Sequence, residues 1–206
     1  MSHNSLIQTV WGEVQRVFGA LKTGEVTQKC PLVTSRVPGM QPAQADEIVD
    51  KAIKNVQMIL DQRISDLQTW SPKTQQDFQK WFGTTAPEHR NLVLERLKKE
   101  KALTENLTKE NFFQAEGKYA DEKKLFAYVH PNDPKKIFLG EAFANAPDMG
   151  SNSRAGTLAH EISHFTVIAG TNDYAYGEKD CSALALADPE RALNNADNYE
   201  FFLEKL

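Results

Sequence analysis

An apolar stripe over residues 43–67 constrains the fold of this chain more than any other feature. Apolar residues recur there at three- and four-residue spacing, as they do on one face of an α-helix. Pro42 stands just ahead of the stripe, where its fixed φ suits the first turn of a helix. We therefore expect one long helix with its apolar face buried against other elements. The stripe consists of Ile48, Val49, Ala52, Ile53, Val56, Ile59, Leu60, Ile64 and Leu67.

Further helices are predicted on both sides of this one. Ser71-Pro72 breaks the chain, a short helix follows until Gly83, and another covers about residues 87–102. Residues 1–18 could form one more amphipathic helix, and residues 19–41 resemble a loop-rich connector. We therefore divide the chain into an N-terminal extension, 1–41, and a domain, 42–206, whose first half, 42–116, is helical.

The pattern changes after Gly117. Alternating apolar residues at 125–129, a turn at 131–134 and a second apolar run at 137–139 predict a β-hairpin. Residues 144–153 are expected to form a loop. A helix should begin near Ser153, run to about residue 168 and end before Gly170. Two short helices, at about 181–187 and 188–203, close the predicted second half, 117–206. The fold class is α+β, with the helical half packed against a small hairpin sheet to form a cleft.

Composition excludes several functional classes. The 206 residues contain 24 Lys and Arg against 28 Asp and Glu, so no basic field attracts nucleic acid or an anionic membrane. No apolar run is long enough for membrane insertion. The N-terminal residues lack the basic start and apolar core of a Sec signal peptide, which favours the cytoplasm or a non-classical export route. Cys30 and Cys181 do not form a CxxC pair, and we expect them to be buried or free thiols.

The segment His160-Glu161-Ile162-Ser163-His164 carries the strongest chemical signal. On a helix, positions i and i+4 lie on one face, so both histidines can reach one metal ion. Glu161 can approach a water molecule on that metal. The alternative is two surface or hydrogen-bonded histidines on an ordinary helix.

Two histidines do not complete a catalytic zinc site, which takes three protein ligands and one open position for water. The remaining histidines are His3, His89 and His130, and none of them follows the motif. The third ligand is therefore a carboxylate or one of these distant histidines. Asp173 is the nearby carboxylate, because Gly170 lets the chain reverse after the helix. Tyr176 could bring a phenol to the same cleft, although residues 170–177 taken alone are typical of an ordinary turn.

HEISH followed by GTNDYAYG resembles the aspzincins, the deuterolysin family of zinc metallopeptidases, and more closely their peptidyl-Lys metalloendopeptidases. Other stretches resemble family elements in the same order. They are WFG at 81–83, AYVHPNDPKKIFLGEAF in the hairpin, APDMGSNSRAGTLAHEISHFTV around the motif and NNADNYEFFLE in the closing helix. The resemblance covers about residues 43–204 and is densest over 125–204.

The resemblance implies a zincin-like fold and a zinc-dependent endopeptidase that binds one catalytic Zn²⁺ ion. His160, His164 and Asp173 would bind zinc. Glu161 would be the general base on the zinc-bound water, and Tyr176 would hydrogen-bond the developing oxyanion.

In the lysine-specific members, carboxylates on the closing helix line the pocket for the residue after the scissile bond. Asp197 and Glu200 occupy those positions here, and at i and i+3 they share one helix face. They would bind substrate and direct cleavage to the N-terminal side of lysine. The alternatives are a solvated acidic face, or an Asp197 that supports the site through hydrogen bonds.

A protein or peptide substrate is expected to lie extended along residues 137–139, adding a strand at a free edge. Departures from the family leave two other functions open. Gly140 stands where secreted members often have cysteine, and residues 1–41 match nothing in the family. The chain could be a bacterial effector or toxin peptidase with a narrow target and a cognate inhibitor or immunity protein. It could also be a catalytically silent relative that binds peptide.

Overall fold

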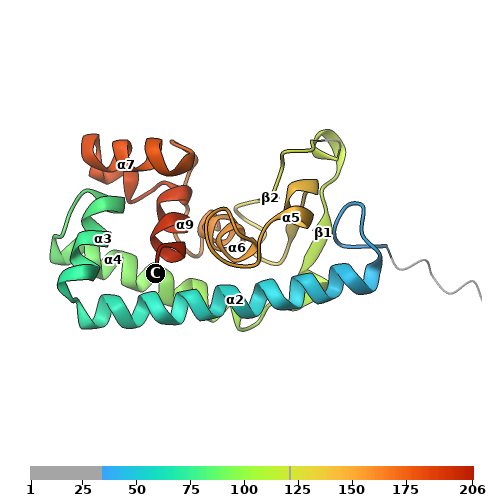
Figure 1. Ribbon diagram of the computed structural model, residues 1–206, viewed down its shortest axis with the longest axis horizontal. Helices are drawn as coiled ribbons and strands as arrows, with labels where there is room; N and C mark the ends of the chain where they lie inside the picture. The colour runs from blue at the N-terminus through green and yellow to red at the C-terminus, as the bar shows by residue number, and fades with distance from the viewer. Residues whose placement is uncertain (1–33, 121) are drawn as a thin grey trace, which may run out of the picture. The chain divides into compact units, whose positions relative to one another are not determined.

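The computed structural model describes residues 34–120 and 122–206 (Figure 1). The predicted helix over residues 1–18 and Cys30 lie outside the described residues. The helical half consists of α2 (Pro42–Thr69), α3 (Pro72–Phe82) and α4 (Pro87–Thr104), which confirms the three predicted helices. A proline opens each of them, where its missing N–H costs no helical hydrogen bond.

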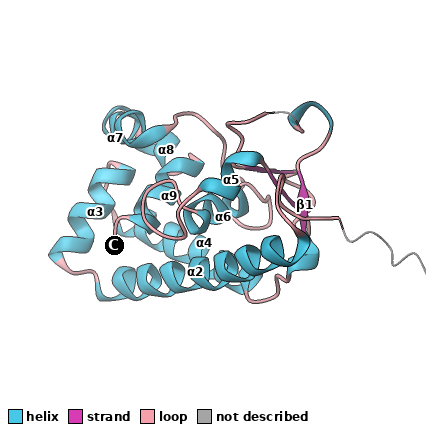
Figure 2. Cartoon of the chain, turned by 45° about the vertical axis from the view of Figure 1, so that its right-hand side comes forward, coloured by secondary structure: helices cyan, strands magenta, loops and turns pink. Residues whose placement is uncertain are grey.

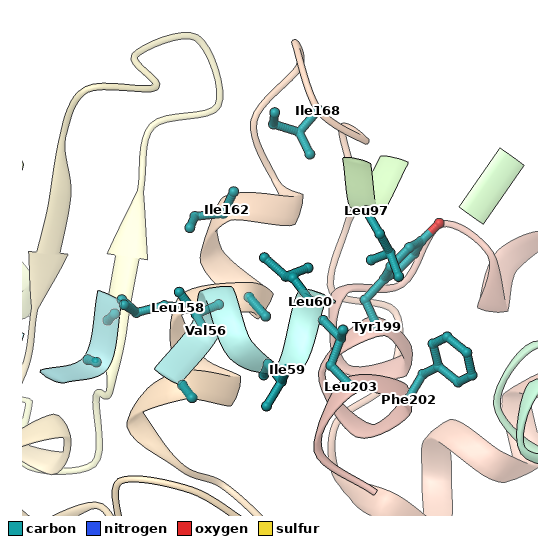
Figure 3. Close-up of a cluster of buried hydrophobic side chains, with 14 of the residues drawn as sticks. Val56, Ile59, Leu60, Leu97, Leu158, Ile162, Ile168, Tyr199, Phe202 and Leu203 are labelled. Carbon is teal, nitrogen blue, oxygen red and sulfur yellow. The ribbon is translucent and has the colours of Figure 1, made fainter. Parts of the chain in front are cut away.

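Helix α2 is the base on which the other elements lie (Figure 1). Its buried face includes Val49, Val56 and Leu60, and it packs against α4, α6 (Arg154–Ser163) and α9 (Ala196–Glu204). Figure 3 shows how side chains of α2, α4, α6 and α9 meet in one core. Leu158 and Ile162 of α6 (Arg154–Ser163) are fully buried in this core. The apolar stripe therefore supports the helix that carries the two motif histidines.

Arg63 is an unexpected member of the buried face of α2, because its side chain is only 1% exposed. Its guanidinium donates hydrogen bonds to the carbonyl oxygens of Phe202 and Lys205, at the C-terminal end of α9 (Ala196–Glu204). Asp66 and Asp77 each lie 3.3 Å from Nη1 and balance the buried charge. Arg63 therefore ties α9 to α2 through the carbonyls that a helix end leaves without partners.

The sheet has three strands in the order β1 (Phe112–Gln114), β3 (Ile137–Leu139) and β2 (Ala127–Val129). The antiparallel pair β2–β3 confirms the predicted hairpin, and Ala127 faces Leu139 in its register. The parallel strand β1 was not predicted, because three residues are too few for a recognisable alternation. Strand β1 also shows that the expectation of a free edge at residues 137–139 for the substrate is wrong. β3 is the central strand with partners on both sides, so it has no free edge, whereas β2 has a described partner on one side only.

Short elements complete the described chain (Figure 2). They are the 3₁₀ turns η1 (Lys109–Asn111) and η2 (Gly117–Tyr119), and helices α5 (Glu141–Asn145), α7 (Gly177–Ala187) and α8 (Pro189–Ala192). Helix α5 starts just after the predicted hairpin and ends in the predicted loop. The helix predicted over residues 188–203 is instead two helices, α8 and α9, with a break between them. Gly83 at φ +68° ends α3 so close to α7 that a Cβ would meet the carbonyl oxygen of Ala185.

Residues 34–41 lie in the part that we assigned to an N-terminal extension. Val37 is fully buried there. Arg36 donates a hydrogen bond to Asp46 at 2.9 Å and another to the carbonyl oxygen of Phe112 at 3.2 Å. These contacts attach the stretch to α2 and β1, while the boundary between residues 41 and 42 stays a prediction.

Candidate active site

Hydrogen bonds at the first turn of α6 fix the start of the helix that carries the motif. The Ser153 hydroxyl accepts a hydrogen bond from the amide of Gly156 and caps the helix, as the sequence predicts. The carboxylate of Glu204, at the end of α9, accepts hydrogen bonds from the amide and hydroxyl of Ser153 at 2.8 and 2.7 Å. A Cβ on Gly156 would collide with the same Glu204 side chain. The start of α6 is therefore seated against the end of α9.

The helix ends at Ser163, earlier than the predicted residue 168, and a series of turns follows. His164 keeps helical angles of φ −66° and ψ −24°, so the i, i+4 relation with His160 survives. The two imidazole rings lie 5.0 Å apart between their centroids. The early ending brings the chain reversal closer to the histidines, with Gly170 at φ +59° in the left-handed region.

After this reversal the chain returns Asp173 to both imidazoles. One oxygen of Asp173, Oδ1, lies 3.2 Å from Nε2 of His160 and 3.4 Å from Nε2 of His164. Ligand atoms of the three residues all lie within 4.8 Å of one another. The other described histidines, His89 and His130, are not part of this group. Two imidazole nitrogens and one carboxylate oxygen form a donor set that zinc accepts, so the residues present fit the ion.

The far side of the His160 ring faces α9. Its Nδ1 lies 2.8 Å from Oδ1 of Asp197 and 3.2 Å from Oε2 of Glu200. Both residues are buried, at 7% exposure each. The second oxygen of Asp197 accepts a hydrogen bond from the amide of Gly177 at 2.7 Å. The spacing thus brings both residues to the site, and the solvated-face alternative is wrong.

His164 has a partner that the sequence did not reveal. Its Nδ1 lies 2.9 Å from the carbonyl oxygen of Thr171, which orients the ring with Nε2 toward Asp173. The Thr171 hydroxyl in turn lies 2.6 Å from the hydroxyl of Ser163. Neither threonine nor serine has a recognisable motif role, and the contact depends on the path of the turn after α6.

The electrostatics of the site favour a cation at its centre. Burial alone would lower the pKa of His160, but Asp173, Asp197 and Glu200 outweigh it and raise that pKa well above its usual value. Burial and the neighbouring His160 lower the pKa of His164. Burial raises the pKa of Glu161 to about 7, helped by the surrounding carboxylates. Four acidic side chains thus surround one imidazole.

Tyr176 lies at the edge of this cluster. Its ring is 62% exposed and nearly parallel to that of His160, with 6.4 Å between the centroids. Burial of the hydroxyl and the charge of Asp173 raise the pKa of Tyr176 to about 12. The phenol therefore stays protonated and able to donate a hydrogen bond at neutral pH.

These groups line a cleft of about 680 Å³. One wall is the chain from Leu125 to Pro131, which includes β2, and the other consists of α6, the loop after it and the start of α9. The cleft thus joins the chain around β2 to the histidines and carboxylates.

Comparison with known proteins identifies the family. The family of lysine-specific metallo-endopeptidases, the aspzincins, matches residues 68–204, about two thirds of the chain. The chain belongs to this family. A solved structure of the zinc peptidase from Grifola frondosa has the same fold, with a TM-score of 0.70 and 33% identity over 81% of this chain and 97% of that one.

Several aspzincin relatives match in sequence. An extracellular protease of Aeromonas hydrophila is 52% identical over 83 residues, 40% of this chain and 24% of that protein. A peptidyl-Lys metalloendopeptidase of Armillaria mellea is 49% identical over 83 residues. The chain spans about a quarter of the length of these two relatives. A peptidyl-Lys metalloendopeptidase of Pleurotus ostreatus is 36% identical over 124 residues, 60% of this chain and 70% of that protein.

Two other expectations bear on location and redox state. Among the described residues, no helix has both the length and the apolar character needed to cross a bilayer.

Cys181 is buried on α7, and its pairing with Cys30 stays untested because Cys30 is not described. The export route likewise stays a prediction.

Proposed function

We propose that this aspzincin is a zinc-dependent endopeptidase that hydrolyses protein or peptide substrates. The observation that carries the proposal is the approach of one Asp173 oxygen to both histidine Nε2 atoms. His160, His164 and Asp173 would hold one zinc ion. When bound, zinc supplies a Lewis acid that polarises the scissile carbonyl and makes water a better nucleophile near neutral pH.

Glu161 would act as the general base that takes the proton of the attacking water and later delivers it to the leaving amine. Its pKa of about 7 suits both steps, because the carboxyl group gains and loses a proton readily at neutral pH. The protonated Tyr176 hydroxyl would donate a hydrogen bond to the oxygen that gains negative charge. Both side chains line the cleft with the three candidate ligands.

Asp197 and Glu200 would bind the lysine side chain that follows the scissile bond. Both carboxylates lie at the Nδ1 side of His160, and a neutral imidazole donates only one proton there. Within the described residues, no Lys or Arg side chain forms an ion pair with either of them. Such a pair, buried and short of cations, suits an ammonium group. Supporting His160 and binding lysine are compatible, because the two oxygens of an ionised carboxyl group together accept about four hydrogen bonds.

The substrate backbone would add to the free edge of β2. In the antiparallel register, Phe126 pairs with Gly140 through a 2.8 Å hydrogen bond, so the alternate residues Ala127 and Val129 direct their backbone groups away from β3. Residues of β2 line the cleft. An extended peptide could therefore pair with β2 while its scissile bond lies over the motif histidines.

The replacement Glu161→Gln tests the proposal. The variant should keep its zinc, because Glu161 is not among the ligands, and lose about 10²–10⁴-fold or more of its peptidase activity with the general base. Zinc content by elemental analysis and casein digestion measure the two properties. Equal activity of the variant and the native chain would refute the general-base role.

The same experiment distinguishes the silent relative, in which the native chain itself would bind zinc without digesting casein. The effector or toxin alternative concerns the target rather than the chemistry. The relatives described here carry protease names and support neither a toxin role nor an immunity partner.

A further inference from the structure

The loop between α6 and α7 carries both Asp173 and Tyr176, yet it has almost no regular structure of its own. Much of its order comes from Asn195, whose side chain is fully buried. Oδ1 of Asn195 accepts hydrogen bonds from the amides of Tyr174, at 2.7 Å, and Ala175, at 3.0 Å. Its Nδ2 donates to the carbonyl oxygen of Ala175 at 3.0 Å and to Oδ1 of Asn198 at 2.8 Å. All four hydrogen-bonding positions of the carboxamide are therefore in use.

The position of Asn195 in the chain makes this arrangement unusual. Asn195 is the N-cap residue of α9, a place where asparagine normally accepts a hydrogen bond from the first turn of its own helix. Here the side chain makes no such bond. It is directed at the loop instead, and the helix forgoes that cap. Asn195 can take this role because α8 ends at Ala192 and α9 begins only at Ala196, so that Asn195 lies in the break between the two helices.

The contacts of Asn195 and its neighbours flank Asp173. On one side, the amide of Asn172 donates to the carbonyl oxygen of Asn194 at 2.9 Å, and the amide of Ala196 donates to the carbonyl oxygen of Asn172 at 3.0 Å. On the other side is the bond from the Tyr174 amide to Asn195. The backbone of Asp173 is thus held at both neighbours.

Tyr176 is held in the same way. The preceding residue, Ala175, exchanges two hydrogen bonds with the Asn195 side chain. The amide of the following residue, Gly177, donates to Asp197. One buried carboxamide therefore bonds to the backbone of the residue after Asp173 and of the residue before Tyr176.

We propose that Asn195 is a positioning residue, which holds Asp173 and Tyr176 in place for zinc binding and for contact with the substrate. The inference rests on the proposed function, because it takes Asp173 as a zinc ligand. No other side chain of this size has both an uncharged carbonyl oxygen that accepts hydrogen bonds and an NH₂ group that donates them. Leucine would leave the amides of Tyr174 and Ala175 without their partner, and aspartate would place a buried negative charge against the carbonyl oxygen of Ala175.

Zinc affinity measured by competition with a chromogenic chelator tests the proposal without any activity assay. In Asn195→Ala, the dissociation constant for zinc should rise about 10- to 100-fold, as for other residues that orient a ligand. Hydrogen exchange at the amides of Tyr174 and Ala175 should become faster. Asn195→Asp keeps the shape and the acceptor, so it should show a smaller rise and serves as the test if the alanine variant does not fold.

Leu67→Ala is the control for general damage to the core. Leu67 is also fully buried, but it lies near the end of α2, which carries no residue of the candidate site. Its zinc dissociation constant should stay within about threefold of the native value even where its melting temperature falls as far as that of Asn195→Ala. An equal loss of zinc affinity in Leu67→Ala would overturn the positioning role, because it would reflect general damage to the core.

Asp173→Ala separates the two proposals. If it loses zinc while both Asn195 variants keep native affinity and native amide exchange, Asn195 is not a positioning residue and the proposed site stands. If Asp173→Ala itself binds zinc as the native chain does, the assignment of the ligand fails, and the inference about Asn195 fails with it.

Discussion

At the scale of single residues, His160 has the most constrained environment in the site. Its Nε2 faces Asp173, and its Nδ1 faces Asp197 and Glu200. A ring with acidic groups on both sides retains a positive charge, either as a proton or through a metal ion. Proton and zinc therefore compete for the same imidazole.

This competition predicts how zinc binding depends on pH. Because the pKa of His160 is raised well above its usual value of about 6.5, the metal-free chain holds a proton there at neutral pH. Zinc must displace that proton, so its affinity should rise with pH by about tenfold per unit while pH is below that pKa. Zinc dissociation constants at several values between pH 6 and pH 8 measure the effect. A flat profile over this range would contradict the protonated state of His160.

At the scale of elements, α4 shows a face that hydrophobic spacing alone does not explain. Its buried residues are Val93, Leu97, Glu100 and Thr104, at helical spacing on one side. Glu100 is 1% exposed, and its Oε1 has no hydrogen-bond partner among the described residues. Burial raises the pKa of Glu100 well above its usual value. The core thus contains a carboxyl group that is most stable when it is protonated.

Glu100→Gln should therefore change how stability depends on pH. In the native chain, the folded state holds the Glu100 proton more tightly than the unfolded state, so the contribution of this group to stability is present in acid and is lost as pH rises past about 4.5. The neutral amide does not lose a proton. We compare the free energy of unfolding of the variant with that of the native chain at each pH. This difference should shift in favour of the variant by about 1–3 kcal/mol from pH 5 to pH 8.

Urea unfolding of the metal-free chains at both pH values measures this difference. Glu95→Gln is the control, because Glu95 lies on the exposed side of the same helix and pairs with Lys99. It should change the pH dependence little. An unchanged pH dependence in Glu100→Gln would show that Glu100 is not kept neutral by the fold.

At the scale of the whole molecule, the cleft lies between the chain around β2 on one side and α6, the loop after it and the start of α9 on the other. Its β2 edge suits any extended peptide, because backbone hydrogen bonds do not distinguish side chains. Selection among peptides must therefore come from side-chain contacts, and Asp197 and Glu200 are the acidic groups next to the motif.

Glu200→Gln should weaken the choice of lysine. The replacement removes one negative charge from the proposed pocket and leaves Asp197 in place, so the ratio of kcat/KM for lysine over neutral residues should fall at least tenfold. Sequencing the new N-termini after digestion of a denatured protein measures the preference. Glu47→Gln, on an exposed position of α2, should keep it. A native profile without lysine at the new N-termini would rule out the acidic pocket.

Much of this fold could be predicted from local patterns. The bounds of α2 follow from Pro42 and the apolar stripe, and the hairpin follows from its alternation and turn. These features depend on neighbours in the chain, which the sequence displays directly. Elements of three to five residues, such as β1 and α5, carry too little pattern to be found in this way.

The sequence by itself determined the chemistry of the site, because His160, Glu161 and His164 lie on one helix turn and a glycine permits the return to Asp173. Only the tertiary structure decided how this chemistry is oriented. Thr171 reaches His164 through the path of a turn, and Asn195 reaches the loop across a break between two helices that appeared as one in the sequence. Such contacts join segments that are distant in the chain or irregular, and neither distance nor irregular backbone leaves a periodic trace in the sequence.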